Sequence, residues 1–143
     1  MQELVGDLIR TAGDSVPRES FTVYVIEDDE SIRRAIGRLL RSFGYHALTF
    51  ESAEEFLDST AGASEGCLIL DIRLPGMTGL DLHERLASSR AKYSVIFMTA
   101  HDRPQWQERA KKAGALAYLK KPFGDQSLLD AIETAYTKGS LMQ

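Results

Sequence analysis

The sequence has a single cysteine, no long apolar run and no excess of basic residues, and each shortage excludes a class of protein. Cys67 has no second cysteine for an internal disulfide, so we expect a core residue in a reducing, cytoplasmic compartment. No apolar stretch approaches the roughly 20 residues that cross a bilayer, and the start of the chain lacks the basic-then-apolar order of a secretory signal. The net charge is −4 with both signs mixed along the chain, so we expect no membrane partner and no direct nucleic-acid binding.

The length of 143 residues suits one ordinary domain with a short appendage. Residues 1–20 lie outside the pattern described below, and we expect an N-terminal extension or linker there, either a short helix or disordered. Residues 21–138 carry the domain, and residues 139–143 are expected to form a C-terminal tail.

Four short apolar segments each end on polar residues of the kind that phosphoryl chemistry needs. Continuous Val, Ile and Leu runs are typical of parallel strands covered by helices on both faces, and such sheets collect their ligand site at the carboxyl ends of the strands. A hydroxyl, an ammonium group and several carboxylates are therefore expected to meet in one crevice. The segments and the residues that follow them are 23–26 before Glu27, Asp28 and Asp29; 67–70 before Asp71; 95–98 before Thr99; and 116–119 before Lys120, Lys121 and Pro122.

Segments with helical periodicity alternate with these strands. Apolar residues recur at steps of three and four over 32–43, and Gly44 follows as a left-handed stop. Five strands and five helices in alternation predict a doubly wound α/β fold with a parallel five-stranded sheet in the order 2-1-3-4-5. The remaining predicted elements are a strand at 45–50, a helix capped by Ser52, a helix at 80–87, a helix at 104–113 after a capping-box-like sequence from Asp102, and a helix at 128–136.

The predicted strand order opens a crevice between the first and third strands, beside Asp28, Asp29 and Asp71. Crowded carboxylates raise their own pKa values unless they share a cation, and oxygen ligands suit a hard ion, so we expect a bound Mg²⁺. Phosphoryl transfer needs a metal, an ammonium group and hydroxyl or N–H donors around the transferring group. Thr99 and Lys121 fit these roles, and Asp71 is free to attack.

Taken singly, these residues have ordinary explanations. A lone aspartate at a strand end, such as Asp28 or Asp29, is more often a turn former or a helix cap. Thr99 alone would be a cap, Lys121 a solvated charge, and Glu27 a solvated side chain or a peripheral modulator of metal affinity. Their joint placement at one edge of the sheet favours function.

Four motifs together resemble the receiver domain of two-component response regulators, nearest to the NarL/FixJ type. The resemblance covers residues 21 to about 138 and implies a flavodoxin-like or CheY-like fold. The motifs are Glu27-Asp28-Asp29-Glu30, the decapeptide from Leu70 to Gly79, Met98-Thr99-Ala100 and Lys121-Pro122-Phe123.

The resemblance assigns a role to most of the polar residues. Asp71 would be the phosphoryl acceptor, and Mg²⁺ would be held by Asp28, Asp29, Asp71 and the backbone carbonyl of Arg73. The hydroxyl of Thr99 and the N–H of Ala100 would bind phosphoryl oxygens. Lys121 would pair with Asp71 or its phosphate, and the Lys121–Pro122 peptide is expected to be cis.

The resemblance also implies how the signal leaves the site. Phosphorylation would draw Thr99 toward the acceptor and let Tyr118 turn inward, which remodels the face formed by the predicted helix 104–113, strand 116–119 and helix 128–136. Arg73 and His101 lie two positions beyond Asp71 and Thr99, so either side chain could obstruct or order the water that hydrolyses the phosphoaspartate, or simply be exposed.

We therefore expect a phosphorylation-dependent signalling switch rather than an enzyme for external substrates. A sensor histidine kinase or a histidine phosphotransfer protein would donate the phosphoryl group, and a downstream protein or a second copy of the chain would bind the remodelled face. The chain would be a stand-alone receiver or the receiver half of a transcriptional regulator. A Mg²⁺-dependent phosphatase acting through an aspartyl-phosphate has little sequence left for a substrate pocket, and a flavodoxin-like carrier would need a phosphate loop after the first strand.

Overall fold

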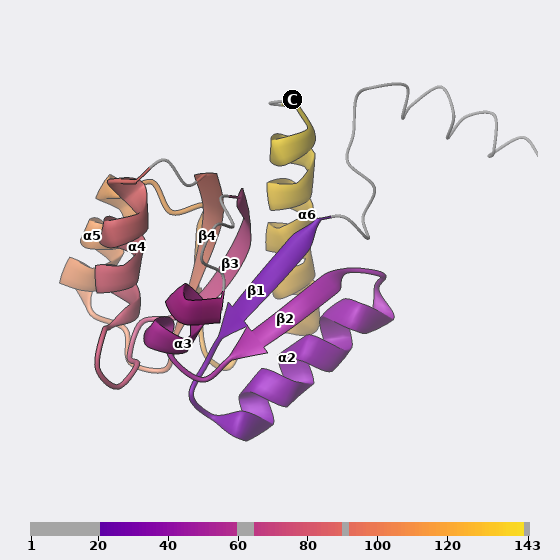
Figure 1. Ribbon diagram of the computed structural model, residues 1–143, viewed down its shortest axis with the longest axis horizontal. Coiled ribbons are helices and arrows are strands. Elements are labelled where there is room, and N and C mark those ends of the chain that lie inside the picture. The colour runs from indigo at the N-terminus through magenta and orange to yellow at the C-terminus, as the bar shows by residue number, and fades with distance from the viewer. Residues whose placement is uncertain (1–20, 60–64, 90–91, 142–143) are drawn as a thin grey trace, which may run out of the picture.

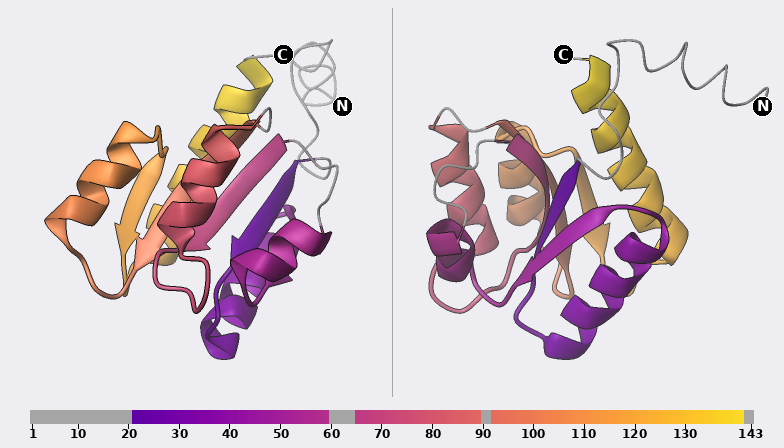
Figure 2. Two further views of the ribbon diagram at one scale, coloured as in Figure 1. Left: turned by 60° about the vertical axis from the view of Figure 1, so that its left-hand side comes forward. Right: turned by 45° about the vertical axis from the view of Figure 1, so that its right-hand side comes forward.

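The computed structural model describes residues 21–59, 65–89 and 92–141, and it arranges five strands as one sheet with helices on both faces (Figures 1 and 2). The strands run in the order β2-β1-β3-β4-β5 and every pair is parallel, which confirms the predicted topology. The strands are β1 Thr22–Ile26, β2 His46–Phe50, β3 Glu65–Asp71, β4 Lys92–Thr99 and β5 Ala117–Lys120. The helices are α2 Glu30–Ser42, α3 Ala53–Ser59, α4 Gly79–Ala87, α5 Pro104–Lys112 and α6 Asp125–Leu141.

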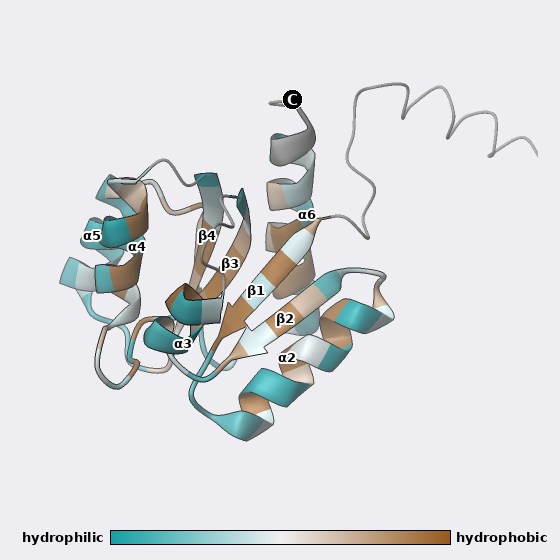
Figure 3. Cartoon of the chain, viewed as in Figure 1, coloured by the Kyte–Doolittle hydropathy of each residue, from teal (hydrophilic) through white to brown (hydrophobic). Residues whose placement is uncertain are grey.

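Each face of the sheet packs against its own set of helices. Successive side chains of a strand point to opposite faces, so Val23 and Val25 join the cluster under α2 and α6, while Tyr24 and Ile26 join the cluster under α3, α4 and α5. This double burial explains the apolar runs of β1 and β3, which carry most of the brown colour in the sheet of Figure 3. Cys67 lies fully buried in the first cluster, and burial raises the pKa of its thiol to about 12.

The helix ends follow local chemistry with one exception. Gly44 and Gly114 have positive φ angles of 86° and 87° at the ends of α2 and α5, where the missing Cβ removes the steric cost. Ser52 caps α3 by accepting from the N–H of Glu55 at 3.0 Å, as predicted. The capping box predicted from Asp102 is wrong: the N-cap of α5 is Arg103, which makes no side-chain capping bond.

The last helix extends further than the sequence pattern predicts. Helix α6 runs to Leu141, so residues 139–141, expected in the tail, continue the helix. The predicted extension at residues 1–20 and the last two residues of the predicted tail lie outside the described residues. Within the described part of the chain, no helix combines the length and the apolar character that crossing a membrane requires.

The strand ends bring the polar segments to one edge of the sheet. Ile26, Leu70, Phe97 and Tyr118 lie in one row across β1, β3, β4 and β5, so the residues that follow them share that edge. Helix α4 starts very close to the end of β3. Its first residue is Gly79, and a Cβ at this position would collide with the backbone carbonyl of Asp71. Glycine is therefore required where α4 begins.

Candidate functional site

Three carboxylates meet at the carboxyl ends of β1 and β3. Glu27, Asp28 and Asp71 each place one oxygen within 4.8 Å of the others. Glu27 and Asp71 are only 1% and 5% exposed, whereas Asp28 faces solvent. Glu27 still belongs to the sheet edge, since its N–H donates to the carbonyl of Phe50 at 3.0 Å. The cluster thus has a buried floor and an open side.

Lys121 supplies the cation of this cluster. Its Nζ lies 2.6 Å from Oε1 of Glu27 and 3.1 Å from Oδ2 of Asp71. Its backbone N–H donates to the carbonyl of Thr99 at 2.8 Å, and the peptide bond to Pro122 is cis, as expected. The neighbouring Lys120 instead extends to Asp102 at 3.0 Å with a largely exposed side chain. The structure therefore brings Lys121, and not Lys120, to the acidic cluster.

The electrostatics of the cluster favour a further cation. Burial raises the pKa of Glu27 to about 7, and the negative charge of Asp71 adds to this rise, although Lys121 and the N–H of Asp29 oppose it. Burial by itself lowers the pKa of Lys121, but Glu27 and Asp71 outweigh it, so the net pKa lies above its usual value. Three carboxylates and one ammonium group leave an excess of negative charge when all are ionised. An all-oxygen donor set with this excess fits Mg²⁺.

Asp29 does not join this cluster. Its Oδ1 accepts from the N–H of Ile32 at 3.1 Å, so it is the N-cap of α2. The predicted metal set of Asp28, Asp29, Asp71 and the Arg73 carbonyl therefore differs from the carboxylates that meet here, because Glu27 stands where Asp29 was expected. Of the two interpretations of Glu27, a solvated side chain is wrong, because Glu27 is buried and its backbone pairs with Phe50; an effect on metal affinity stays a prediction. The burial of Glu27 could have been predicted from the sequence only by aligning β1 with β2 so that Glu27 pairs with Phe50.

The other predicted residues surround the acceptor on two loops. Oδ1 of Asp71 accepts from the N–H of Arg73 at 3.0 Å, so the loop after β3 folds back onto the acceptor. Thr99 is buried, and its Oγ1 donates to the carbonyl of His101 at 3.0 Å and accepts from its N–H at 3.1 Å. Ala100, His101 and Arg73 are exposed at this rim. The hydroxyl of Thr99 is thus engaged by its own loop.

The side chain of Tyr118 contacts the loop between β4 and α5 at Asp102. Its hydroxyl donates to Oδ1 of Asp102 at 2.9 Å, and its ring is half-buried against the cluster under α3, α4 and α5. Burial, followed by the hydrogen bond to Asp102, raises the pKa of Tyr118 to about 12. We call this arrangement, in which the hydroxyl of Tyr118 is held by the exposed Asp102, the outward orientation.

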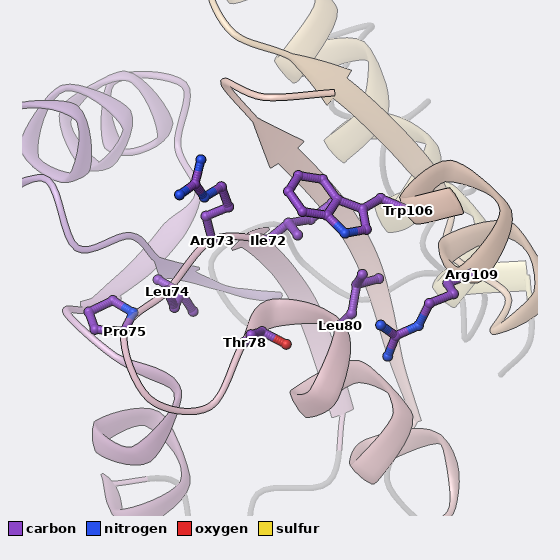
Figure 4. Close-up of a pocket in the computed structure, with 8 residues that line it drawn as sticks. All are labelled: Ile72, Arg73, Leu74, Pro75, Thr78, Leu80, Trp106 and Arg109. Carbon is purple, nitrogen blue, oxygen red and sulfur yellow. The ribbon is translucent and has the colours of Figure 1, made fainter. Parts of the chain in front are cut away.

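A groove of about 390 Å³ adjoins the acceptor (Figure 4). Ile72 and Arg73, which follow Asp71, form one side, and Trp106 and Arg109 of α5 form the other. Arg109 makes two hydrogen bonds to Glu84 on α4, at 2.9 and 3.1 Å, which joins α4 to α5 at the base of this surface. The loop that follows β3 therefore borders an open surface that a partner can approach.

Comparison with known proteins agrees with this geometry. Residues 23–133 match the family described as response regulator receiver domain. The chain is 46% identical over 113 residues to nodulation protein W of Bradyrhizobium diazoefficiens, covering 79% of this chain and 50% of that protein. It is 37% identical over 113 residues to the transcriptional regulatory protein FixJ of the same organism, covering 79% and 55%.

A solved structure gives the same result. The crystal structure of a response regulator receiver protein from Burkholderia phymatum shares 42% identity and a TM-score of 0.71, with 81% of this chain and 94% of that chain covered. The chain spans about half the length of the curated relatives it matches. Receiver domains are signalling domains that pair with histidine kinases and bind Mg²⁺ at an acidic pocket. The fold, the acidic cluster and these matches together place the chain in the response regulator receiver domain family of two-component systems, with relatives of the NarL/FixJ type.

Proposed function

We propose that the chain is a phosphorylation-dependent switch in which Asp71 accepts a phosphoryl group from the phosphohistidine of a kinase or a histidine phosphotransfer protein. The observation that carries this is the environment of Asp71, a nearly buried carboxylate whose Oδ2 lies 3.1 Å from Nζ of Lys121 and whose Oδ1 is held by the N–H of Arg73. Both oxygens are therefore fixed in place, and the next two residues, Ile72 and Arg73, line the open groove.

The residues present can perform each part of this transfer. A carboxylate oxygen of Asp71 attacks the phosphorus, and the histidine nitrogen of the donor leaves with the bonding electron pair. Lys121 offsets the negative charge that gathers on the phosphoryl oxygens. The hydroxyl of Thr99 and the N–H of Ala100 can bind these oxygens once Thr99 has released His101. Attack of water on the phosphorus then breaks its bond to Asp71, which restores the carboxylate and releases inorganic phosphate.

We infer that Glu27, Asp28 and Asp71, with the carbonyl of Arg73, hold Mg²⁺ directly or through water. The mutual distances of the three carboxylates support their assignment as metal ligands, whereas the carboxylate of Asp29 caps α2. When bound, Mg²⁺ supplies positive charge to the carboxylates and to the incoming phosphoryl oxygens. Without it, the repulsion among the carboxylates would also act on the incoming anion.

The output of this switch would be the surface formed by α5, β5 and α6. We propose that Thr99 moves toward the phosphoryl group, that Tyr118 turns inward, and that a downstream protein or a second copy of the chain binds the altered surface. Arg73 and His101 are proposed to tune the lifetime of the phosphoaspartate, since both lie at the exposed rim of the acceptor. A cytoplasmic location stays a prediction.

A second candidate function is the receiver half of a longer transcriptional regulator. It is favoured by the share of the relatives that the chain covers, about half, and by the description of FixJ as a transcriptional regulatory protein. In this case, the surface formed by α5, β5 and α6 would control an attached output domain instead of a separate protein.

The proposal is tested by counting phosphoryl groups. The protein is incubated with acetyl phosphate in Mg²⁺ or in EDTA, and intact mass spectrometry is combined with measurement of released inorganic phosphate. The switch predicts at most one phosphoryl group per chain, formed only with Mg²⁺, with slow release. Rapid multiple turnover on acetyl phosphate and on small phosphomonoesters would instead indicate the phosphatase considered above.

A further inference from the structure

Asp102 is the centre of a polar network outside the acceptor site. Its carboxylate accepts from the hydroxyl of Tyr118 at 2.9 Å and from Nε2 of Gln107 at 2.9 Å, and it lies 3.0 Å from Nζ of Lys120. Tyr118 and Lys120 are two residues apart on β5, so their side chains leave the same face of the strand. Hydrogen bonds from Gln107 and then Lys120 lower the pKa of Asp102, which keeps its carboxylate ionised.

The network is tied to the acceptor site by one short loop. Thr99 ends β4 and binds both backbone groups of His101, and Asp102 is the next residue. The loop is thus held at its start by the hydroxyl of Thr99 and at its end by the hydroxyl of Tyr118. If Thr99 turns to a phosphoryl oxygen, His101 loses both bonds, and the backbone that positions Asp102 is no longer fixed.

The position of Tyr118 also shapes the surface proposed for output. Tyr118 lines a groove of about 540 Å³ between α5 and β5, together with Gln107 and Ala117. A ring that leaves this groove changes its shape, and a carboxylate that holds the ring there opposes the change.

We propose that Asp102 is a positioning residue that holds Tyr118 outward and thereby sets the fraction of unphosphorylated chains in the active arrangement. The inference rests on the proposed function, because it concerns the response to phosphorylation of Asp71. Asp102 acts through Tyr118 and does not touch the reacting atoms. Removing its carboxylate leaves the outward tyrosine hydroxyl without its acceptor, so the inward orientation becomes more populated and ligands that prefer it bind more tightly.

The test uses beryllium trifluoride with Mg²⁺, which forms a tetrahedral adduct on a carboxylate oxygen and mimics a phosphoryl group. The equilibrium affinity for beryllium trifluoride is measured for the wild type, Asp102→Ala and Asp102→Asn, and Asp130→Ala is the matched control. Asp130 on α6 also accepts from a glutamine side chain, Gln126, at 2.8 Å. We expect Asp102→Ala to increase the affinity about three- to tenfold, the range of one hydrogen bond. Asp102→Asn, which keeps an acceptor oxygen, should have a smaller effect, and Asp130→Ala none.

A double-variant comparison separates a positioning role from a general structural one. In a Tyr118→Phe background the hydroxyl is absent, so Asp102→Ala should no longer change the affinity. Ring signals of Tyr118 in the unphosphorylated protein, assigned with Tyr118→Phe, should shift in Asp102→Ala. Unchanged affinity and ring signals in Asp102→Ala, or an equal gain in the Tyr118→Phe background, overturn the role of Asp102. Failure of the wild type to bind beryllium trifluoride in an Asp71-dependent manner overturns the proposed function instead.

Discussion

Replacing Lys121 by methionine tests how the acidic cluster is balanced. Methionine keeps most of the length and apolar volume of the lysine stem but removes the ammonium group, which lies 2.6 Å from Glu27 and 3.1 Å from Asp71. Because the side chains of these partners are only 1% and 7% exposed, the variant leaves two buried carboxylates without their cation. Removing one partner of a buried ion pair costs about 3–5 kcal/mol.

The destabilisation caused by Lys121→Met should depend on pH. The pKa of Glu27 is about 7 even with Lys121 present, so at pH 5.5 the carboxyl can hold a proton and avoid the unpaired charge. We expect Lys121→Met to lower the free energy of unfolding by about 3–5 kcal/mol at pH 8 in EDTA, and by much less at pH 5.5. Mg²⁺ should restore stability to the variant, because a ligand at 100 times its Kd adds about 2.7 kcal/mol.

The assay is urea unfolding followed by far-ultraviolet circular dichroism. Lys120→Met is the control, because it removes the adjacent ammonium group, whose side chain is 64% exposed; its effect should stay below about 1 kcal/mol. Two results would refute the reasoning. One is that Lys121→Met lowers the free energy of unfolding at pH 8 no more than Lys120→Met does, and the other is that Lys121→Met lowers it equally at pH 8 and pH 5.5.

Three further predictions concern a buried histidine, the rim of the acceptor and the switch threonine. His83 is 5% exposed, its Nδ1 has no hydrogen-bond partner among the described residues, and burial lowers its pKa. The histidine of the unfolded chain therefore takes up a proton near pH 6.5, whereas the folded chain does so only at lower pH, so the free energy of unfolding falls as the pH drops below that value. In urea titrations the wild type should lose more stability than His83→Met between pH 7 and 5.5. Equal losses would contradict this. Arg73→Ala and His101→Ala should each change the decay rate of the phosphorylated form, followed by phosphate release, and unchanged rates in both reject the tuning role. Thr99→Ala should abolish the difference in partner affinity between phosphorylated and unphosphorylated protein, measured by calorimetry, and an unchanged difference shows that Thr99 does not transmit the signal.

The sequence predicted the sheet well because its signals are local or follow general rules. The apolar runs at 23–26, 67–70 and 95–98 are buried on both sides, which leaves a continuous pattern that is hard to mistake, and the strand order follows from right-handed crossovers. Gly44 indicated a helix end for a purely local reason, since glycine adopts its positive φ angle without steric cost.

The details that the sequence could not settle depend on distant partners. Glu27 is drawn into the site by Lys121, 94 positions away in the chain, and by strand pairing with Phe50. Asp29, two residues later, is the N-cap of α2, and no local pattern distinguishes its role from that of Glu27. Asp102 looked like a cap because it precedes a helix, but its carboxylate is used by Tyr118 and Lys120 of β5. Contacts across the chain decided both cases.

The most direct test of the central proposal locates the phosphoryl group on the chain. After reaction with acetyl phosphate in Mg²⁺, borohydride reduces an aspartyl phosphate to homoserine, and peptide mass spectrometry identifies the position. We predict homoserine at position 71 in the wild type, and no incorporation in Asp71→Asn or in EDTA. Reduction at another carboxylate, or full labelling of Asp71→Asn, would contradict the assignment of Asp71 as the phosphoryl acceptor.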